Sequence, residues 1–192
     1  MHPASPDRLP PLPAERMDDA QRAAAAELIA GPRKAVKGPF IPLLRSPELL
    51  TRVQKLGEHL RFHTALSPRA SEFATLLVAR AWTQPFEWAV HVPLARRAGT
   101  SEATIEAVRD GRRPGDMDDE EACVHDFTHE LLQHHGVSDA TYRAALARFG
   151  ERGVVELTSL VGYFAMVSMV LNVARTPAEP AEDVAPLPRW PL

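Results

Sequence analysis

The sequence is poor in the residues and motifs that carry redox chemistry or nucleotide binding. Only one of its 192 residues is a cysteine, Cys123, so it forms no internal disulfide and contains no CxxC pair. It also contains no GxGxxG, no GxxxxGK[ST] and no GxSxG, the local signatures of nucleotide-binding loops and hydrolase nucleophiles. Because the fold does not depend on an oxidising compartment, the cytoplasm is the expected location.

A surplus of basic charge is missing as well. The chain has 22 Lys and Arg against 25 Asp and Glu, with a formal net charge of −3. Proteins that bind nucleic acids neutralise phosphates with a basic stripe, so the sequence predicts no nucleic-acid partner. With 45% hydrophobic and 24% charged residues, the composition is that of a soluble globular protein long enough to bury a core.

Long apolar runs are absent except at 154–174. That stretch has the length of a membrane span, but polar side chains interrupt it and no second span or basic flank accompanies it. The interrupting residues are Glu156, Thr158, Ser159, Ser168 and Asn172. A helix that is apolar nearly all round also suits the core of an oligomer, so we predict a buried helix and no membrane partner.

Proline gathers at both ends of the chain. Residues 1–17 lack the apolar segment of a secretory signal and are predicted to form an exposed arm. Residues 176–192 are predicted to form an extended, polyproline-like tail that could lie on a neighbouring subunit. Between the two arms, residues 18–175 are predicted to form a single helical domain.

Start and stop signals divide this domain into helices. Ser46-Pro47 and Ser67-Pro68 each place an N-cap residue before a first-turn proline, while Gly31-Pro32 and Gly99 supply helix ends. The predicted helices span about 18–30, 46–62, 67–82, 85–98, 101–110, 118–135, 139–149 and 151–175. The loop at 31–47 contains four prolines and is predicted to be non-helical. No strand-like alternation is present, so the predicted fold class is all-α.

Glu87 and His91 are the first candidates for chemistry, because residues four apart share one face of a helix. A neighbouring carboxylate orients an imidazole and raises its pKa, as an acid/base site requires. The same spacing also fits a structural ion pair on a helix surface. Aromatic neighbours and Pro93, which predicts a kink beside His91, favour the acid/base reading. Glu72 is a third acid, and its alternative role is to stabilise a helix dipole.

A second row, Glu121, His125 and His129, also lies on one helix face. Two histidines at this spacing can bind zinc, but a site needs further ligands, and the general-base glutamate of HExxH is not in place. We therefore predict no metal and no cofactor. Cys123 is interpreted as a small core residue, because no basic neighbour in the sequence lowers its pKa.

The block SPRASEFATLLVARAWTQPFEWAVHVPLARRAGTSEATIEAV, at 67–108, resembles the carboxymuconolactone decarboxylase and alkylhydroperoxidase D-like superfamily. Its peroxidase branch carries C-x-x-C-x-x-x-H with a glutamate twelve residues before the first cysteine. In this chain the cysteine positions hold Gln84 and Glu87, while His91 and Glu72 match the histidine and the glutamate. Without sulfur at either position, the chain looks like the decarboxylase-type variant of an alkylhydroperoxidase D-like helical bundle.

The resemblance implies a cofactor-free lyase or isomerase acting on a small carboxylated lactone or related carbonyl acid. In that interpretation His91 is the general acid/base, Glu87 its partner and Glu72 a support. Five further residues are candidates to bind the substrate, Arg80 and Arg96 through its carboxylate. The five are Arg80, Trp82, Gln84, Trp88 and Arg96.

Two other functions stay open at this point. Cys123 could act alone as a peroxidatic thiol, or the chain could be a non-catalytic helical module for ligand binding or assembly. The resemblance also implies a homo-oligomer, trimeric or hexameric, with the apolar stretch at 154–171 and the proline-rich arms as interface material.

Overall fold

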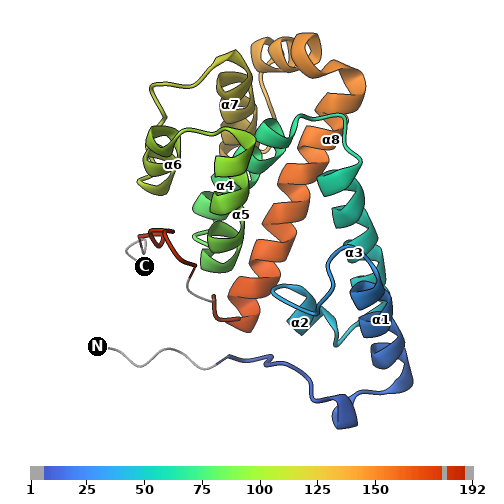
Figure 1. Ribbon diagram of the computed structural model, residues 1–192. Coiled ribbons are helices and arrows are strands. Elements are labelled where there is room, and N and C mark those ends of the chain that lie inside the picture. Colours follow the sequence, from blue (N-terminus) through green and yellow to red (C-terminus); the bar gives the residue numbers. More distant parts are fainter. Residues whose placement is uncertain (1–6, 179–180, 189–192) are drawn as a thin grey trace.

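Helices make up all the regular structure in the part of the chain that this computed structural model describes, residues 7–178 and 181–188 (Figure 1). After a short 3₁₀ turn, Ala14–Arg16, the helices are α1 (Asp19–Ala30), α2 (Phe40–Leu43), α3 (Pro47–Phe62), α4 (Pro68–Ala81), α5 (Pro85–Ala98), α6 (Glu102–Arg109), α7 (Asp119–His134) and α8 (Asp139–Ala174). The predicted all-α class is confirmed.

Side-chain caps explain where several helices begin. Asp18 forms a capping box with Gln21 at the start of α1. Ser67 and Ser138 each accept a hydrogen bond from a backbone N–H in the first turn of α4 and α8. These starts coincide with the predicted ones, because a cap depends only on residues within one turn of the helix.

Pro42 and Pro93 both lie within helices, although the sequence predicted that prolines would prevent or kink a helix at these positions. The loop at 31–47 contains one helical turn, α2, because Pro42 lies in its first turn, where no backbone N–H is needed for an intrahelical bond. Pro93 does not end α5, which continues to Ala98 and is closed by the left-handed Gly99 at φ 100°. Gly150, with φ 66° and ψ 177°, breaks α8 where two helices were predicted.

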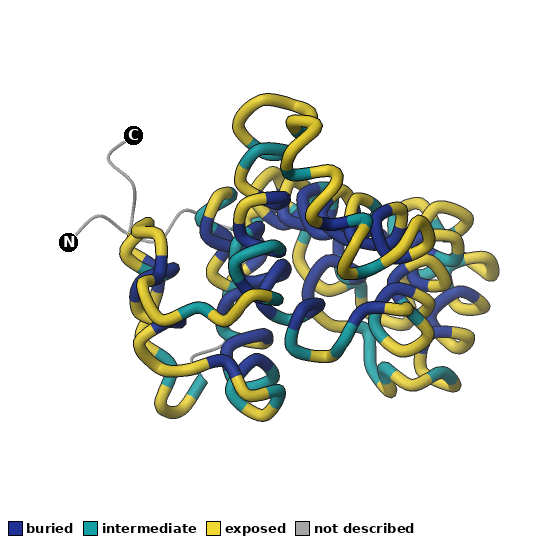
Figure 2. The backbone as a smooth tube through the Cα atoms, turned by 90° about the horizontal axis from the view of Figure 1, so that it is seen from above, coloured by how far each residue is buried: buried dark blue, intermediate teal, exposed yellow. Residues whose placement is uncertain are grey.

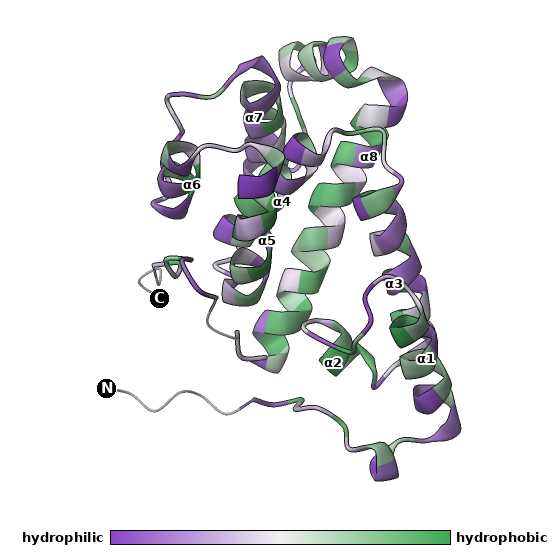
Figure 3. Ribbon diagram, in the orientation of Figure 1, coloured by the Kyte–Doolittle hydropathy of each residue, from purple (hydrophilic) through white to green (hydrophobic). Residues whose placement is uncertain are grey.

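The second part of α8 forms the centre of the molecule. α8 as a whole packs against α3, α4 and α7, and its second part is hydrophobic along most of its length (Figures 1 and 3). In Figure 2 the buried positions lie toward the interior of the bundle, and the exposed ones form its outer surface. α8 is long and apolar enough to cross a membrane, but more than half of its most apolar window is buried, as in the core helix of a soluble protein.

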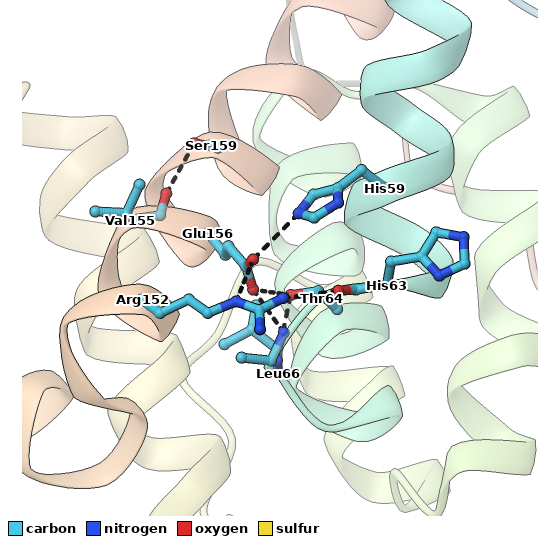
Figure 4. Close-up of polar contacts among 9 residues, drawn as sticks. His59, His63, Thr64, Leu66, Arg152, Val155, Glu156 and Ser159 are labelled. Atoms are coloured by element: carbon cyan, nitrogen blue, oxygen red, sulfur yellow. Dashed lines mark hydrogen bonds and ion pairs between the residues drawn. The ribbon is translucent and has the colours of Figure 1, made fainter.

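A buried carboxylate joins α8 to the end of α3 (Figure 4). Glu156, 8% exposed, accepts hydrogen bonds from His59 Nε2 at 3.1 Å, Thr64 Oγ1 at 2.8 Å and Arg152 Nε at 2.9 Å, and from the Ala65 backbone N–H. Burial opposes the charged form, but the donors hold the pKa of Glu156 at about 2 against an ordinary 4.5. We call these five residues the Glu156 cluster.

The described part of the C-terminal tail packs on α5 of its own chain. The Trp88 indole Nε1 donates a hydrogen bond to the Ala185 carbonyl at 3.0 Å, and Arg96 Nη1 donates one to the Asp183 carbonyl at 2.9 Å. Leu187 is buried in the hydrophobic core. This part of the tail therefore covers one side of the helix that carries Glu87 and His91.

Candidate active site

The paired helices α4 and α5 bring Glu72, Glu87 and His91 together. His91 Nδ1 lies 2.6 Å from Glu72 Oε2, and His91 Nε2 lies 3.4 Å from Glu87 Oε2. His91 is 2% exposed and Glu87 4% exposed, so the imidazole stands between two carboxylates inside the protein. The Phe164 ring of α8 contacts the imidazole edge-on, with centroids 5.0 Å apart. We call Glu72, Glu87 and His91 the His91 cluster.

The two carboxylates decide the charge of the imidazole. Burial by itself lowers the pKa of His91, but the hydrogen bonds and charges of Glu72 and Glu87 outweigh it and raise the pKa above its ordinary value. Glu72, at the shorter distance, orients the ring through Nδ1. The two carboxylates therefore favour the protonated, imidazolium form of His91.

A cavity of about 300 Å³ opens on one side of this cluster. Glu87 and His91 line it together with residues of the 31–39 loop, α2, the end of α3 and α8. Its polar groups include Arg33, Arg61 and Tyr163, and its apolar wall includes Phe40, Phe86 and Phe164. Its volume is at the small end for ligand sites, which suits a small organic molecule.

The His91 cluster lies inside the one segment with a family match. A sequence profile of the carboxymuconolactone decarboxylase family matches residues 47–122, from the start of α3 into α7. This segment is thus similar to that family over about two fifths of the chain's length. No curated protein matches the chain. The Arg33 and Tyr163 side of the cavity is built from outside the segment that matches the carboxymuconolactone decarboxylase family.

The five predicted substrate-binding residues all lie in the described part of the chain, and none lines the cavity beside His91. Gln84 caps α5: its Oε1 accepts from the Phe86 N–H at 2.7 Å, and its Nε2 donates to Asn172 Oδ1 at 2.8 Å. Trp88 lies in the core under the C-terminal tail. Gln84 is thus tied to α8 through Asn172, and Trp88 to the tail through Ala185.

The two arginines and Trp82 are also placed elsewhere. Arg96 forms a two-bond ion pair with Glu102, at 2.6 and 2.9 Å, on the surface near the tail. Trp82 ends α4 and packs on the edge of the core. Arg80 lines a different, larger cavity. The carboxylate-binding role predicted for Arg80 and Arg96 therefore has no geometric support at the cavity beside His91.

Arg33, Arg61 and Tyr163 were not recognised from the sequence. Arg33 lies in the proline-rich loop and Arg61 near the end of an amphipathic helix, where a solvated charge is the ordinary expectation. Tyr163 offered a weak signal, because it is the only tyrosine within the apolar stretch at 154–174. All three reach the cavity through tertiary packing.

The second cavity, about 620 Å³, lies between α4, α7 and the residues after α6, and includes His125 and His129. These two rings stack nearly parallel, with centroids 5.8 Å apart and an interplanar angle of 11°. Within the described residues no group of three or more His, Cys, Asp or Glu side chains could hold a metal ion. Cys123 lies on another surface with Arg148, and burial raises the pKa of its thiol, which disfavours the thiolate.

Proposed function

We propose that the cavity beside His91 is the active site of a cofactor-free acid/base lyase or isomerase that acts on a small carbonyl acid, with a carboxylated lactone as the expected substrate class. The observation that carries this proposal is a buried imidazole held between two carboxylates, with His91 and Glu87 both lining a cavity. The similarity of residues 47–122 to the carboxymuconolactone decarboxylase family supports decarboxylation as the reaction.

The two ring nitrogens have different tasks in this proposal. Glu72 holds Nδ1 at 2.6 Å and keeps the ring oriented. Glu87 is 3.4 Å from Nε2, which is long for a hydrogen bond, so the Nε2 proton is only weakly held by the protein. Nε2 is therefore the atom that gives a proton to the substrate, and Glu87 is the group that returns one to it.

Decarboxylation would proceed by breaking the bond between the carboxylate and its neighbouring carbon. The electron pair of that bond moves into an enolate, CO2 leaves, and the Nε2 proton then adds to the carbon that CO2 has left. The Tyr163 hydroxyl, in the cavity wall, is a donor suited to stabilise the enolate oxygen. An isomerase would use the same groups to remove a proton from one carbon and return it to another.

The lone-thiol alternative has less support, because Cys123 is outside this cavity and its thiol pKa is raised. The non-catalytic alternative differs from our proposal in one measurable respect, which is turnover. A ligand-binding module would hold small acids without changing them.

The test is an NMR assay in D₂O with carboxylated γ-lactones and 3-oxo acids as substrates. The unaltered protein should release CO2 and place deuterium on the carbon that loses it, and His91→Gln should do neither. His125→Gln removes a buried histidine of the other cavity and serves as the matched control, with turnover unchanged. Binding without CO2 release or deuterium incorporation would contradict the proposal and favour the ligand-binding module.

We also propose that the chain forms a homo-oligomer, as its family resemblance implies. The outward face of α8 supports this, because it exposes residues at spacings of seven and four without a charged side chain. The residues are Val155, Gly162, Met169 and Val173. Light scattering after size exclusion should give a trimer or hexamer, and Val173→Glu should shift it toward monomer; a monomeric parent protein would refute the idea.

A further inference from the structure

Arg33 and Arg61 line the cavity beside His91 with unused hydrogen-bond donors. Arg33 Nε and Nη2 and Arg61 Nε are buried, and within the described residues none of these atoms has a hydrogen-bond partner. The Arg33 guanidinium carbon lies 4.5 Å from the centroid of the Phe40 ring, and that of Arg61 lies 5.3 Å from the Phe62 ring. Aromatic faces thus hold the two cations in place without neutralising them.

This arrangement costs free energy in the empty protein. Arg33 and Arg61 repel each other, and in the described part of the chain neither forms an ion pair with a carboxylate. Glu58 and Glu87 attract Arg33 only at longer range. Partial burial of two positive charges that no carboxylate neutralises is unfavourable, and a bound anion would offset that cost.

We propose that Arg33 and Arg61 form the anion-binding end of the active site and hold a carboxylate that the substrate keeps throughout the reaction. This inference names the substrate class of the proposed site and so rests on the proposed function. Guanidinium groups suit it because their planar donors match the two oxygens of a carboxylate. Lys37, at the exposed rim of the same cavity, adds a third positive charge.

The carboxylate that Arg33 and Arg61 bind must be one that the substrate keeps through the reaction. Arginines that neutralise a carboxylate stabilise the ground state and so oppose loss of that group as CO2. A leaving carboxylate therefore belongs at the opposite end, beside Glu87, where like charge favours its departure.

At the anion-binding end of the cavity, Arg33 and Tyr163 lie close against α3. A Cβ atom on Gly57 of α3 would lie 2.1 Å from the Tyr163 hydroxyl oxygen and 2.7 Å from Arg33 Nη2. Tyr163 and Arg33 therefore rest against α3 in the space that the missing side chain leaves. Arg33 and Tyr163 lie outside the segment that matches the family model, and Gly57 and Arg61 lie inside it, so this end combines residues of both parts of the chain.

The test measures binding by calorimetry with benzoate, a small flat monocarboxylate, and with benzamide, its uncharged analogue. The unaltered protein should bind benzoate, more weakly as salt concentration rises, and should bind benzamide at least 10-fold more weakly. Arg33→Met and Arg61→Met should each weaken benzoate binding about 10-fold or more, and Arg33→Lys should restore part of the loss. Arg109→Met, a similarly part-buried arginine on α6, should bind benzoate normally.

Three results would overturn the proposal: no benzoate binding by the unaltered protein, equal affinity for benzoate and benzamide, or unchanged affinity in both arginine variants. The salt dependence tests the same point in the unaltered protein, so a variant that fails to fold does not hide the answer. His91→Gln should keep its benzoate affinity while losing turnover. Normal benzoate binding with no turnover of any acid would refute the proposed function and leave the anion site standing. Turnover of acids that survives both arginine changes would refute the anion site alone.

Discussion

Two clusters that pair carboxylates with a histidine lie in this molecule, and they are built in opposite ways. In the Glu156 cluster, four donors surround one carboxylate, and His59 is half exposed. In the His91 cluster, two carboxylates surround one buried imidazole at the edge of a cavity. The first arrangement stabilises a negative charge and joins α3 to α8. The second stabilises a proton-carrying ring and leaves one of its nitrogens weakly held.

The largest expected effect separates the two clusters by activity. Glu72→Gln removes one of the two negative charges beside His91, so the pKa of His91 should fall and less imidazolium should be present at neutral pH. We expect kcat to fall about 10- to 100-fold, with the basic limb of the pH–rate profile moved to lower pH. Glu106→Gln on α6 is the exposed control. An unmoved profile would mean that Glu72 does not act through His91.

The second-largest expected effect is on the stability of the protein and concerns the Glu156 cluster. Glu156→Gln replaces a charged acceptor of four donors with an amide that also presents its own N–H groups to Arg152. The free energy of unfolding should fall by about 2 kcal/mol, measured by urea denaturation, while turnover stays unchanged. Glu151→Gln, an exposed neighbour on the same helix, should change stability by less than about 0.5 kcal/mol. If the Glu156→Gln protein folds but loses activity, the Glu156 cluster is not purely structural and its contrast with the His91 cluster is wrong.

Glu156 also affects how the free energy of unfolding changes at acidic pH. Because the pKa of Glu156 is lowered to about 2 in the folded protein, its contribution is present above about 4.5 and is lost as pH falls toward 2. His91 has the opposite sign: its raised pKa contributes stability that is lost as pH rises through that pKa. Unfolding measured from pH 7 to pH 2 should therefore show a flatter acid limb in Glu156→Gln than in the parent protein.

The smallest effect concerns the anion-binding end alone. Gly57→Ala should push Tyr163 and Arg33 away from α3, because its Cβ would overlap both side-chain ends. Benzoate affinity should drop several-fold, while overall stability changes by no more than about 1 kcal/mol, because alanine favours the helix that the contact disfavours. Gly162→Ala has open space around its Cβ and is the matched control. Equal benzoate binding in both variants would show that Gly57 does not position Arg33.

Local patterns predicted most of the helices and the three residues of the His91 cluster. Ser67 and Ser138 cap their helices as predicted, whereas Ser46 precedes α3 without a side-chain cap hydrogen bond. Glu87 and His91 share a helix face, as the i,i+4 spacing requires. The helical turn at Phe40–Leu43 was missed, because the tolerance of a proline depends on its position within a turn and the limits of that turn were not evident.

The residues that line the cavity beside His91 could not be predicted in the same way. Arg96 and Trp88 are near His91 in sequence, but one pairs with Glu102 and the other is covered by the tail. Arg33 and Tyr163 are distant in sequence from His91, and both line its cavity.

The sequence by itself determined that the chain is helical and that Glu72, Glu87 and His91 are the residues to consider, because caps and helix spacing depend on neighbours within a turn or two. Only the tertiary structure decided which side of the imidazole opens to a cavity and which cations stand across from it. That depends on how the 31–39 loop, α3 and α8 pack around α5, and packing is set by contacts between residues far apart in the chain.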